Sequence, residues 1–286
     1  MRHTIRIIPR LDIKGPNLVK GVHLEGLRVL GKPDRFASYY CAGGADELIY
    51  ADVVASLYGR NSLNDIIKKT SENIFLPLTV GGGIRTIEDI RNALLAGADR
   101  VSINTAAINN PGFITEASRR FGASTITVSI EAIKIDDGSY EACTDNGRER
   151  TGVDAIEWSI KAAELGAGQI VVTSINREGS GKGFDIELTK KISENVSIPV
   201  VAHGGAGSVK DVLDVVVKGK ADAVCLSSMT HYEFIENNEF SDDFSSEGNV
   251  EYIKGGGNGF SKIQTATIGE IKNYLIQNGV SCRHYD

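Results

Sequence analysis

Two glycine-rich segments are the most suggestive sites of chemistry in the sequence. Gly81-Gly82-Gly83 and His203-Gly204-Gly205-Ala206-Gly207 each follow an apolar, β-branched run. Glycine lets the backbone approach a ligand closely, and free N–H groups there favour an anion. Asn104-Thr105 and Ser227-Ser228 follow the next apolar runs and offer the donors that phosphate oxygens need. One such loop would more often be a simple turn, but two matched pairs favour two phosphate-binding sites.

Two carboxylates, Asp12 and Glu131, also end apolar runs. An acid at the end of a buried strand is partly desolvated, which moves its pKa toward neutrality and suits it to general acid–base work. The alternative is a solvated acid or a salt bridge to Lys14, Lys20 or Lys134, and for either carboxylate alone that interpretation is at least as good. Together with the phosphate loops, the pair favours catalysis.

The elements that must position these side chains alternate between strand and helix patterns. Amphipathic helical stretches are expected at Thr86–Ala96, Pro111–Phe121, Val153–Leu165 and Ser208–Lys218. Strands that alternate with helices indicate βαβ units and a parallel sheet. The predicted strands are Ile5–Asp12, Glu47–Asp52, Leu76–Val80, Arg100–Asn104, Thr125–Glu131, Gln169–Ser174, Pro199–His203 and Ala223–Ser227.

An internal repeat decides how the sheet closes. Pro77 matches Pro199 and Gly83 matches Gly205, both at an offset of 122 residues. A four-unit half repeated twice predicts a single (β/α)₈ barrel over residues 1–286, whereas an open doubly wound sheet has a switch point instead of such a repeat. The repeat places the two phosphate loops, and the two carboxylates, on opposite sides of the barrel mouth. This geometry suits an elongated substrate with a phosphate at each end.

Two segments interrupt the pattern, and both follow a strand's C-terminal end, where barrel enzymes build their sites. Ala132–Arg150 is too long for an ordinary connection and predicts a small hairpin around Asp136-Asp137-Gly138. Tyr232–Lys262 is acidic, lacks periodicity and is interpreted as a mobile insertion after the eighth strand.

The amino-acid composition excludes several classes of function. The net charge of −6 argues against sequence-independent nucleic-acid binding, which needs a positive surface. No apolar run reaches the roughly 18 residues of a membrane span, and the N-terminus lacks a signal-peptide pattern, so we expect a cytoplasmic protein. The four cysteines are scattered, which predicts neither a disulfide framework nor a zinc site. His203 has no neighbouring ligands and is interpreted as structural; no metal or cofactor is predicted.

The chain resembles the HisF family, the cyclase subunit of imidazole glycerol phosphate synthase, over nearly its whole length except Tyr232–Lys262. The likeness rests on Arg6-Ile7-Ile8-Pro9 running into Leu11-Asp12, Val19-Lys20-Gly21-Val22, Gly44-Ala45-Asp46-Glu47-Leu48, Val80-Gly81-Gly82-Gly83-Ile84, Ser102-Ile103-Asn104-Thr105-Ala106-Ala107, Gly166-Ala167-Gly168, Thr173-Ser174 and Gly204-Gly205-Ala206-Gly207.

The resemblance implies that a HisH-type glutaminase docks at the N-terminal face and that ammonia passes through the barrel to a phosphorylated small molecule. It makes Asp12 the first catalytic acid or base and Glu131 the second. It assigns phosphate or substrate contacts to Lys20, Gly83, Asn104, Thr105, Thr173, Gly179, Gly204, Gly205, Ser227 and Ser228. It assigns an ammonia gate to Arg6, Glu47, Arg100 and Gln169.

Three departures from the family pattern affect these assignments. The second catalytic position is an aspartate in the family and Glu131 here. The extra methylene of glutamate displaces the carboxylate relative to that of aspartate. A misplacement of about 1 Å can cost roughly 10²-fold in rate. The position two residues before Asp12, usually cysteine, is Arg10, which should share a face with Asp12 because strand side chains alternate. One gate acid is the amide Gln169, which leaves a formal charge of +1 where the family is balanced.

Three functions compete. Asp12-Ile13-Lys14-Gly15-Pro16-Asn17 and Ser129-Ile130-Glu131-Ala132 look like a divergent branch of the family that serves amidation of surface-polysaccharide sugars, alongside a glutaminase and a separate sugar amidotransferase. This ammonia-handling role is the favoured hypothesis. The second is an authentic cyclase of histidine biosynthesis with a glutamate variant of its catalytic pair. The third is a non-catalytic scaffold that activates its glutaminase and channels ammonia.

Overall fold

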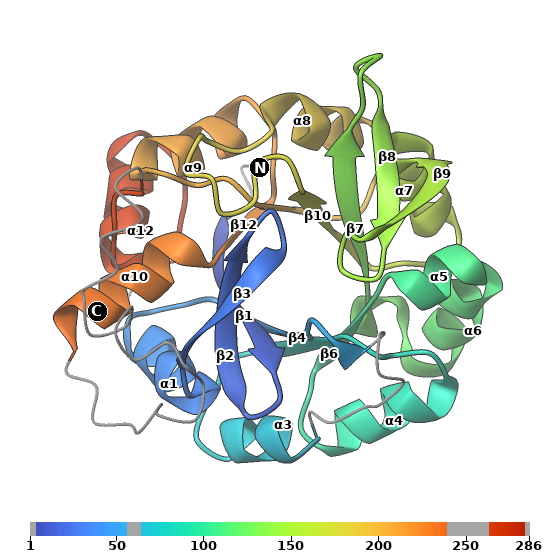
Figure 1. The fold of residues 1–286 in the computed structure, drawn as a ribbon, viewed down its shortest axis with the longest axis horizontal. Helices are drawn as coiled ribbons and strands as arrows, with labels where there is room; N and C mark the ends of the chain where they lie inside the picture. The colour runs from blue at the N-terminus through green and yellow to red at the C-terminus, as the bar shows by residue number, and fades with distance from the viewer. Residues whose placement is uncertain (1–3, 56–63, 239–262, 284–286) are drawn as a thin grey trace.

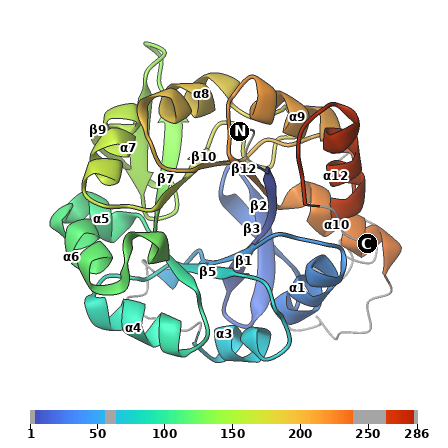
Figure 2. The ribbon, with the colours of Figure 1, turned by 180° about the vertical axis from the view of Figure 1, so that it is seen from behind.

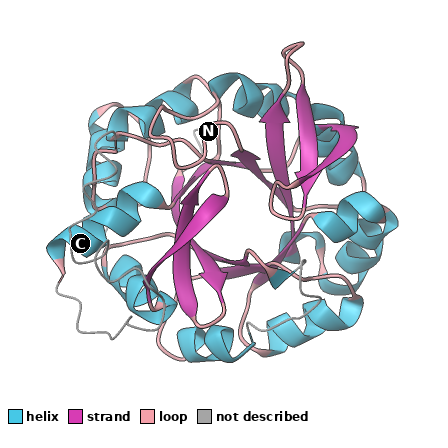
Figure 3. Ribbon diagram, in the orientation of Figure 1, coloured by secondary structure: helices cyan, strands magenta, loops and turns pink. Residues whose placement is uncertain are grey.

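Eight parallel strands close into a barrel in the computed structural model, which describes residues 4–55, 64–238 and 263–283. The ring closes because the last barrel strand pairs with the first, Arg6 opposite Ala223 (Figures 1 and 3). The predicted (β/α)₈ barrel is confirmed. In ring order the strands are β1 (Arg6–Lys14), β4 (Leu48–Asp52), β5 (Leu78–Gly81), β6 (Arg100–Ile103), β7 (Ile126–Lys134), β10 (Gln169–Ser174), β11 (Val200–His203) and β12 (Ala223–Leu226).

Helices surround the barrel on its outside, as Figure 2 shows from behind. Several begin at residues whose side chains satisfy free N–H groups: the Thr86 side chain accepts from the Asp89 backbone N–H, and Ser208 does the same for Asp211. The helices are α1 (Pro33–Ala42), α3 (Asn64–Ser71), α4 (Ile87–Leu95), α5 (Thr105–Asn109), α6 (Gly112–Phe121), α7 (Ala155–Glu164), α8 (Ile186–Asn195), α9 (Val209–Val217), α10 (Ser228–Asn237) and α12 (Ile268–Gln277), with a 3₁₀ turn η1 (Ala123–Thr125).

The strands divide their side chains between two cores. Ile7 and Leu11 of β1 face outward and join the large cluster beneath the helices. Ile8 faces inward and packs with Ile49 and Val171 in a small cluster inside the barrel. Because side chains alternate along a strand, the even-numbered residues of β1 face the barrel interior. Arg6, Arg10 and Asp12 therefore lie along its axis.

The two halves of the barrel repeat each other in detail. Asp99 accepts a hydrogen bond from the Leu78 backbone N–H at 2.8 Å, and Asp222 accepts one from Val200 at the same distance. Gly82 and Gly204, which are 122 positions apart, both adopt positive φ, +93° and +91°. The repeat seen in the sequence therefore extends to the backbone conformation of the two glycine loops.

Further strands project from the barrel beyond the eight that form it. The turn at Asp136-Asp137-Gly138 joins β7 to the antiparallel β8 (Tyr140–Thr144), and β9 (Glu149–Asp154) pairs with β8. A second hairpin, β2 (Asn17–Val22) and β3 (Glu25–Gly31), follows β1 and was not predicted. Both hairpins lie on the barrel face turned toward the viewer in Figure 1.

The predicted insertion at Tyr232–Lys262 begins too early. Residues Tyr232–Asn237 belong to α10, where Tyr232 and Phe234 are buried. Their apolar side chains pack beside α1, with the Phe36 and Phe234 ring centroids 4.3 Å apart, which explains why this stretch is helical. Residues 239–262 lie outside the described residues.

Candidate functional site

Asp12 and Arg10 form a buried ion pair at the C-terminal end of β1. The Arg10 Nε donates to Asp12 Oδ1 at 2.8 Å, and each side chain is 4% exposed. The lysines considered from the sequence are not the partners of Asp12. Arg10 and Asp12 lie on the same face of β1, as predicted. The Asp12 carboxylate is therefore paired with the Arg10 guanidinium inside the barrel.

Glu131 ends the inward-facing row of β7 and is held by an amide. The Asn104 Nδ2 donates to Glu131 Oε2 at 2.5 Å and to the Cys143 carbonyl at 3.0 Å. Burial raises the pKa of Glu131 because the carboxylate loses its hydration, while Arg10 and the Asn104 hydrogen bond act in the opposite direction. A carboxyl group with a raised pKa is suited to donate a proton near neutral pH.

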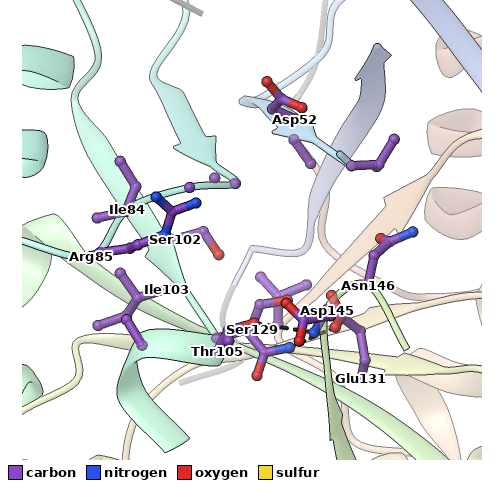
Figure 4. A pocket seen from close by; sticks show the side chains of 18 of the residues that line it. Asp52, Ile84, Arg85, Ser102, Ile103, Thr105, Ser129, Glu131, Asp145 and Asn146 are labelled. Carbon is purple, nitrogen blue, oxygen red and sulfur yellow. Dashed lines mark hydrogen bonds between the residues drawn. The ribbon is translucent and has the colours of Figure 1, made fainter. Parts of the chain in front are cut away.

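A cavity of about 380 Å³ opens above the first glycine loop. Gly81, Gly82 and Gly83 line it together with Asn104 and Thr105, as the sequence predicted for one phosphate site. Gly82 cannot be replaced here, because a Cβ would lie 2.2 Å from the Asp52 carbonyl oxygen. Figure 4 shows Glu131, Asp145 and Asn146 gathered on one side of this pocket and Ser102 and Arg85 on the other. Asp145 and Asn146, between β8 and β9, were not singled out from the sequence.

The second glycine loop is closed much more tightly. Gly179, Gly204, Gly205, Ser227 and Ser228 converge there as predicted, but the cavity that they line measures only about 20 Å³. A phosphate at this loop therefore requires movement of neighbouring residues. The assigned phosphate roles at both loops stay predictions.

Lys20 and Glu178 close this second loop. The Lys20 ammonium is bonded to Glu178, and the two side chains are 3% and 1% exposed. Glu178 also accepts from the Leu24 N–H at 2.9 Å, which ties the β2–β3 hairpin to the segment after β10. Glu178 was missed from the sequence because Arg177-Glu178-Gly179 reads as an ordinary charged turn.

His203 connects the second loop to the interior of the barrel. Its Nδ1 lies 3.0 Å from Thr173 Oγ1, and its Nε2 lies 3.4 Å from Ser227 Oγ. Burial lowers the pKa of His203 well below its usual value, and nearby Arg10 and Lys20 lower it further. The residue is a neutral link between two predicted substrate-contacting hydroxyls. The described residues contain no group of three or more His, Cys, Asp or Glu side chains arranged to hold a metal.

Comparison of the sequence with known proteins establishes the family to which the chain belongs. The family model described as "Histidine biosynthesis protein" matches residues 6–236. The chain is 56% identical over 207 residues to the imidazole glycerol phosphate synthase subunit HisF of Legionella pneumophila, an alignment that covers 72% of this chain and 98% of that protein. It is 47% identical over 229 residues to the same subunit of Alkaliphilus metalliredigens (strain QYMF), covering 80% and 91%. This chain belongs to the HisF family.

The four positions of the expected HisF gate lie together at the strand starts, on the N-terminal face. Arg6 donates to Glu47 at 2.6 Å and to Gln169 Oε1 at 2.9 Å, and Arg100 donates to Glu47 at 2.8 Å. The Glu47 carboxylate thus accepts hydrogen bonds from both guanidinium groups, and the Gln169 amide accepts one through its oxygen only. A cavity of about 470 Å³ lies below this ring and is lined by Arg6, Arg100 and Gln169. The role of the ring as an ammonia gate stays a prediction.

The part of the chain that the structure describes holds no candidate membrane span. Within residues 4–55, 64–238 and 263–283, no helix combines the length and the apolar character that crossing a bilayer requires.

Proposed function

We propose that this chain is a HisF-type synthase subunit that receives ammonia at its N-terminal face and delivers it to a phosphorylated small molecule at the opposite mouth. The observation that carries the proposal is the pair of cavities at the two ends of one barrel. The lower one meets the ring at Arg100 and Gln169. The upper one reaches Ser102 and Val171, two residues further along the same strands, and continues to the first glycine loop and Glu131.

The Arg10–Asp12 pair favours the branch that serves amidation of surface-polysaccharide sugars. A general base must be free to accept a proton, and Asp12 instead accepts from a buried guanidinium. Glu131 is longer than the family aspartate and is already bonded to Asn104. We infer a modified reaction at the mouth, with the ammonia acceptor handled together with a separate sugar amidotransferase.

An authentic cyclase of histidine biosynthesis is the second candidate. Two observations favour it: the relatives carry the name of imidazole glycerol phosphate synthase, and a carboxylate is retained on both sides of the mouth, at Asp12 and Glu131. A non-catalytic scaffold is the third, since the same ion pair that alters catalysis could equally abolish it.

Complementation separates these candidates. Expressed in a bacterium that lacks its own HisF, the chain is expected not to restore growth without histidine, because Arg10 and Glu131 leave cyclisation slow by about 10²-fold or more. A conventional HisF expressed from the same vector is the positive control. Growth of both strains at similar rates would refute the sugar-amidation proposal in favour of histidine biosynthesis.

Exposed apolar side chains support a protein partner at the N-terminal face. The described large hydrophobics with the highest exposure are Phe75 at 91%, Leu95 at 79% and Val217 at 58%. Phe75 lies just before β5, Leu95 ends α4 just before β6, and Val217 ends α9 before β12. All three therefore flank strand starts, around the charged ring. Phe75 and Leu95 precede the neighbouring strands β5 and β6, and Val217 precedes β12 on the same face of the barrel. Contiguous exposed apolar surface marks interaction sites, and we propose that this face receives a HisH-type glutaminase.

Phe75→Ser is expected to weaken that complex about 30-fold, because aromatic anchors at interfaces contribute about 2 kcal/mol or more. The measurement is the Kd with a HisH-type glutaminase from the same organism, together with the stimulation of its glutamine hydrolysis. Glu88→Ser, on the exposed first turn of α4 at the opposite end of the barrel, is the matched control and should bind normally. Equal affinities of the two variants, or no association at micromolar concentrations, would contradict docking at this face.

A further inference from the structure

Three helices on the outside of the barrel enclose a further cavity. Helices α1, α10 and α12 lie side by side there (Figures 1 and 2), and the cavity between them measures about 280 Å³. It is lined by Tyr39 and Tyr40 of α1, by Glu233 of α10, and by Thr267 and Ile268 at the start of α12. Among the described residues, none that lines it also lines a cavity at the mouth or at the charged ring. The cavity is therefore separate from the site described above.

Glu233 brings a buried carboxylate to this cavity. The residue is 5% exposed. In the part of the chain that the structure describes, its carboxylate accepts hydrogen bonds from neutral groups alone: both oxygens lie 2.9 Å from the Tyr39 hydroxyl, and Oε1 lies 3.0 Å from Asn237 Nδ2. No described Lys, Arg or His side chain forms a salt bridge with it.

A carboxylate in such a place favours a cation as its partner. Buried acidic side chains are almost always paired, because the charge has lost its hydration. The neutral donors leave acceptor sites unused, since a carboxylate has about four lone-pair sites and the single Tyr39 hydroxyl hydrogen bonds to one oxygen at a time. Glu270, in the first turn of α12, adds a second negative charge close to Tyr39. A positively charged ligand would therefore be attracted to the cavity.

The remaining walls of the cavity favour an organic cation over a metal ion. The aromatic rings of Tyr39 and Tyr40 line it, and the faces of such rings attract cations. Ile268 adds apolar surface. A metal ion such as Ca²⁺ needs several oxygen ligands, whereas Glu233 is the single carboxylate among the described lining residues. The volume is slightly below the roughly 300 Å³ of the smallest common ligand pockets, so the ligand would have only a few carbon atoms.

We propose that this cavity binds a small organic ammonium ion, whose charged group pairs with the Glu233 carboxylate and whose short hydrocarbon part packs against the tyrosine rings. The proposal does not depend on the proposed function, because the cavity lies outside the barrel. Its occupant would contact the helix that begins at the second glycine loop. Glu233 lies five residues after Ser228 on α10, and Thr230, which also lines the cavity, donates to the Ser227 carbonyl at 3.0 Å.

The test measures binding of n-butylammonium to the full chain alone. The thermal midpoint is followed with increasing n-butylammonium chloride, against sodium chloride at equal ionic strength and 1-butanol at equal concentration. Because a ligand that binds the folded state raises the midpoint, a saturable rise that yields a Kd is expected with n-butylammonium only. Glu233→Gln keeps an acceptor for Tyr39 but removes the charge. It should raise the Kd at least about tenfold, as expected when a charge-assisted hydrogen bond is lost.

Two further variants make the outcome decisive. Glu236→Gln removes an exposed carboxylate from the same helix, one that accepts from Thr265 Oγ1 at 2.7 Å, and it should leave the Kd unchanged. Ala42→Leu narrows the cavity at an exposed lining position and should weaken binding although Glu233 is intact. No saturable rise in the unmodified chain, an equal rise with 1-butanol, or one Kd shared by the unmodified chain, Glu233→Gln and Ala42→Leu would overturn the proposal. Glu233 would then be a structural partner of Tyr39 only.

Discussion

Glu178→Ala is expected to lower the free energy of unfolding by about 3–5 kcal/mol, the usual cost of removing one partner from a buried ion pair. The Lys20 ammonium, 3% exposed, would keep its charge but lose its counterion. The Leu24 N–H would also lose its acceptor. Unfolding in urea, followed by circular dichroism and extrapolated to water, measures the change.

The matched control removes both charges. Lys20→Met combined with Glu178→Leu is expected to unfold at nearly the same denaturant concentration as the unmodified chain, because an apolar pair of similar volume avoids the desolvation cost of both ions. If Glu178→Ala alone changed the unfolding free energy by less than about 1 kcal/mol, water would have to reach Lys20. The β2–β3 hairpin would then stand away from the second glycine loop in solution, which would contradict the tight closure seen there.

Most of the barrel follows from local sequence. Its strands are short apolar, β-branched runs such as Gln169–Ser174 and Val200–His203, and the helices that follow these two begin at the polar N-caps Asp185 and Ser208. The 122-residue repeat, seen in Pro77 with Pro199 and Gly83 with Gly205, then favours a closed barrel over an open sheet, which has a switch point instead. These features depend on neighbours in the chain, which is why a single sequence reveals them.

The features that a sequence does not reveal depend on distant partners. The hairpin at Asn17–Gly31 has no regular alternation in its second strand, where Glu25 and Gly26 are exposed and Val29 is buried. Glu178 acquires its role only because the hairpin brings Lys20 over it. Similarly, alternation along the strand predicts that Arg10 and Asp12 share a face, but not that their charges pair at 2.8 Å inside the barrel.

Restoring the family's residues at the mouth should recover cyclisation. In the Arg10→Cys, Glu131→Asp double variant we expect the turnover of ammonia-dependent imidazole glycerol phosphate formation to rise by about 10²-fold over the unmodified chain. Each single change should give much less. Arg10→Cys alone leaves the second carboxylate displaced by one methylene, and Glu131→Asp alone leaves Asp12 bound to the guanidinium.

The pH dependence gives an independent check on the same variants. Arg10 lowers the pKa of Glu131 through its charge, so removing Arg10 should raise the pKa of a carboxyl group at this position. If that group acts as the acid, the double variant should keep its activity to higher pH than Glu131→Asp alone, because it stays protonated longer. Arg10→Lys, which retains the cation, is the control and should recover neither turnover nor the shifted profile. A double variant no faster than the unmodified chain would show that features beyond these two positions separate this barrel from a cyclase.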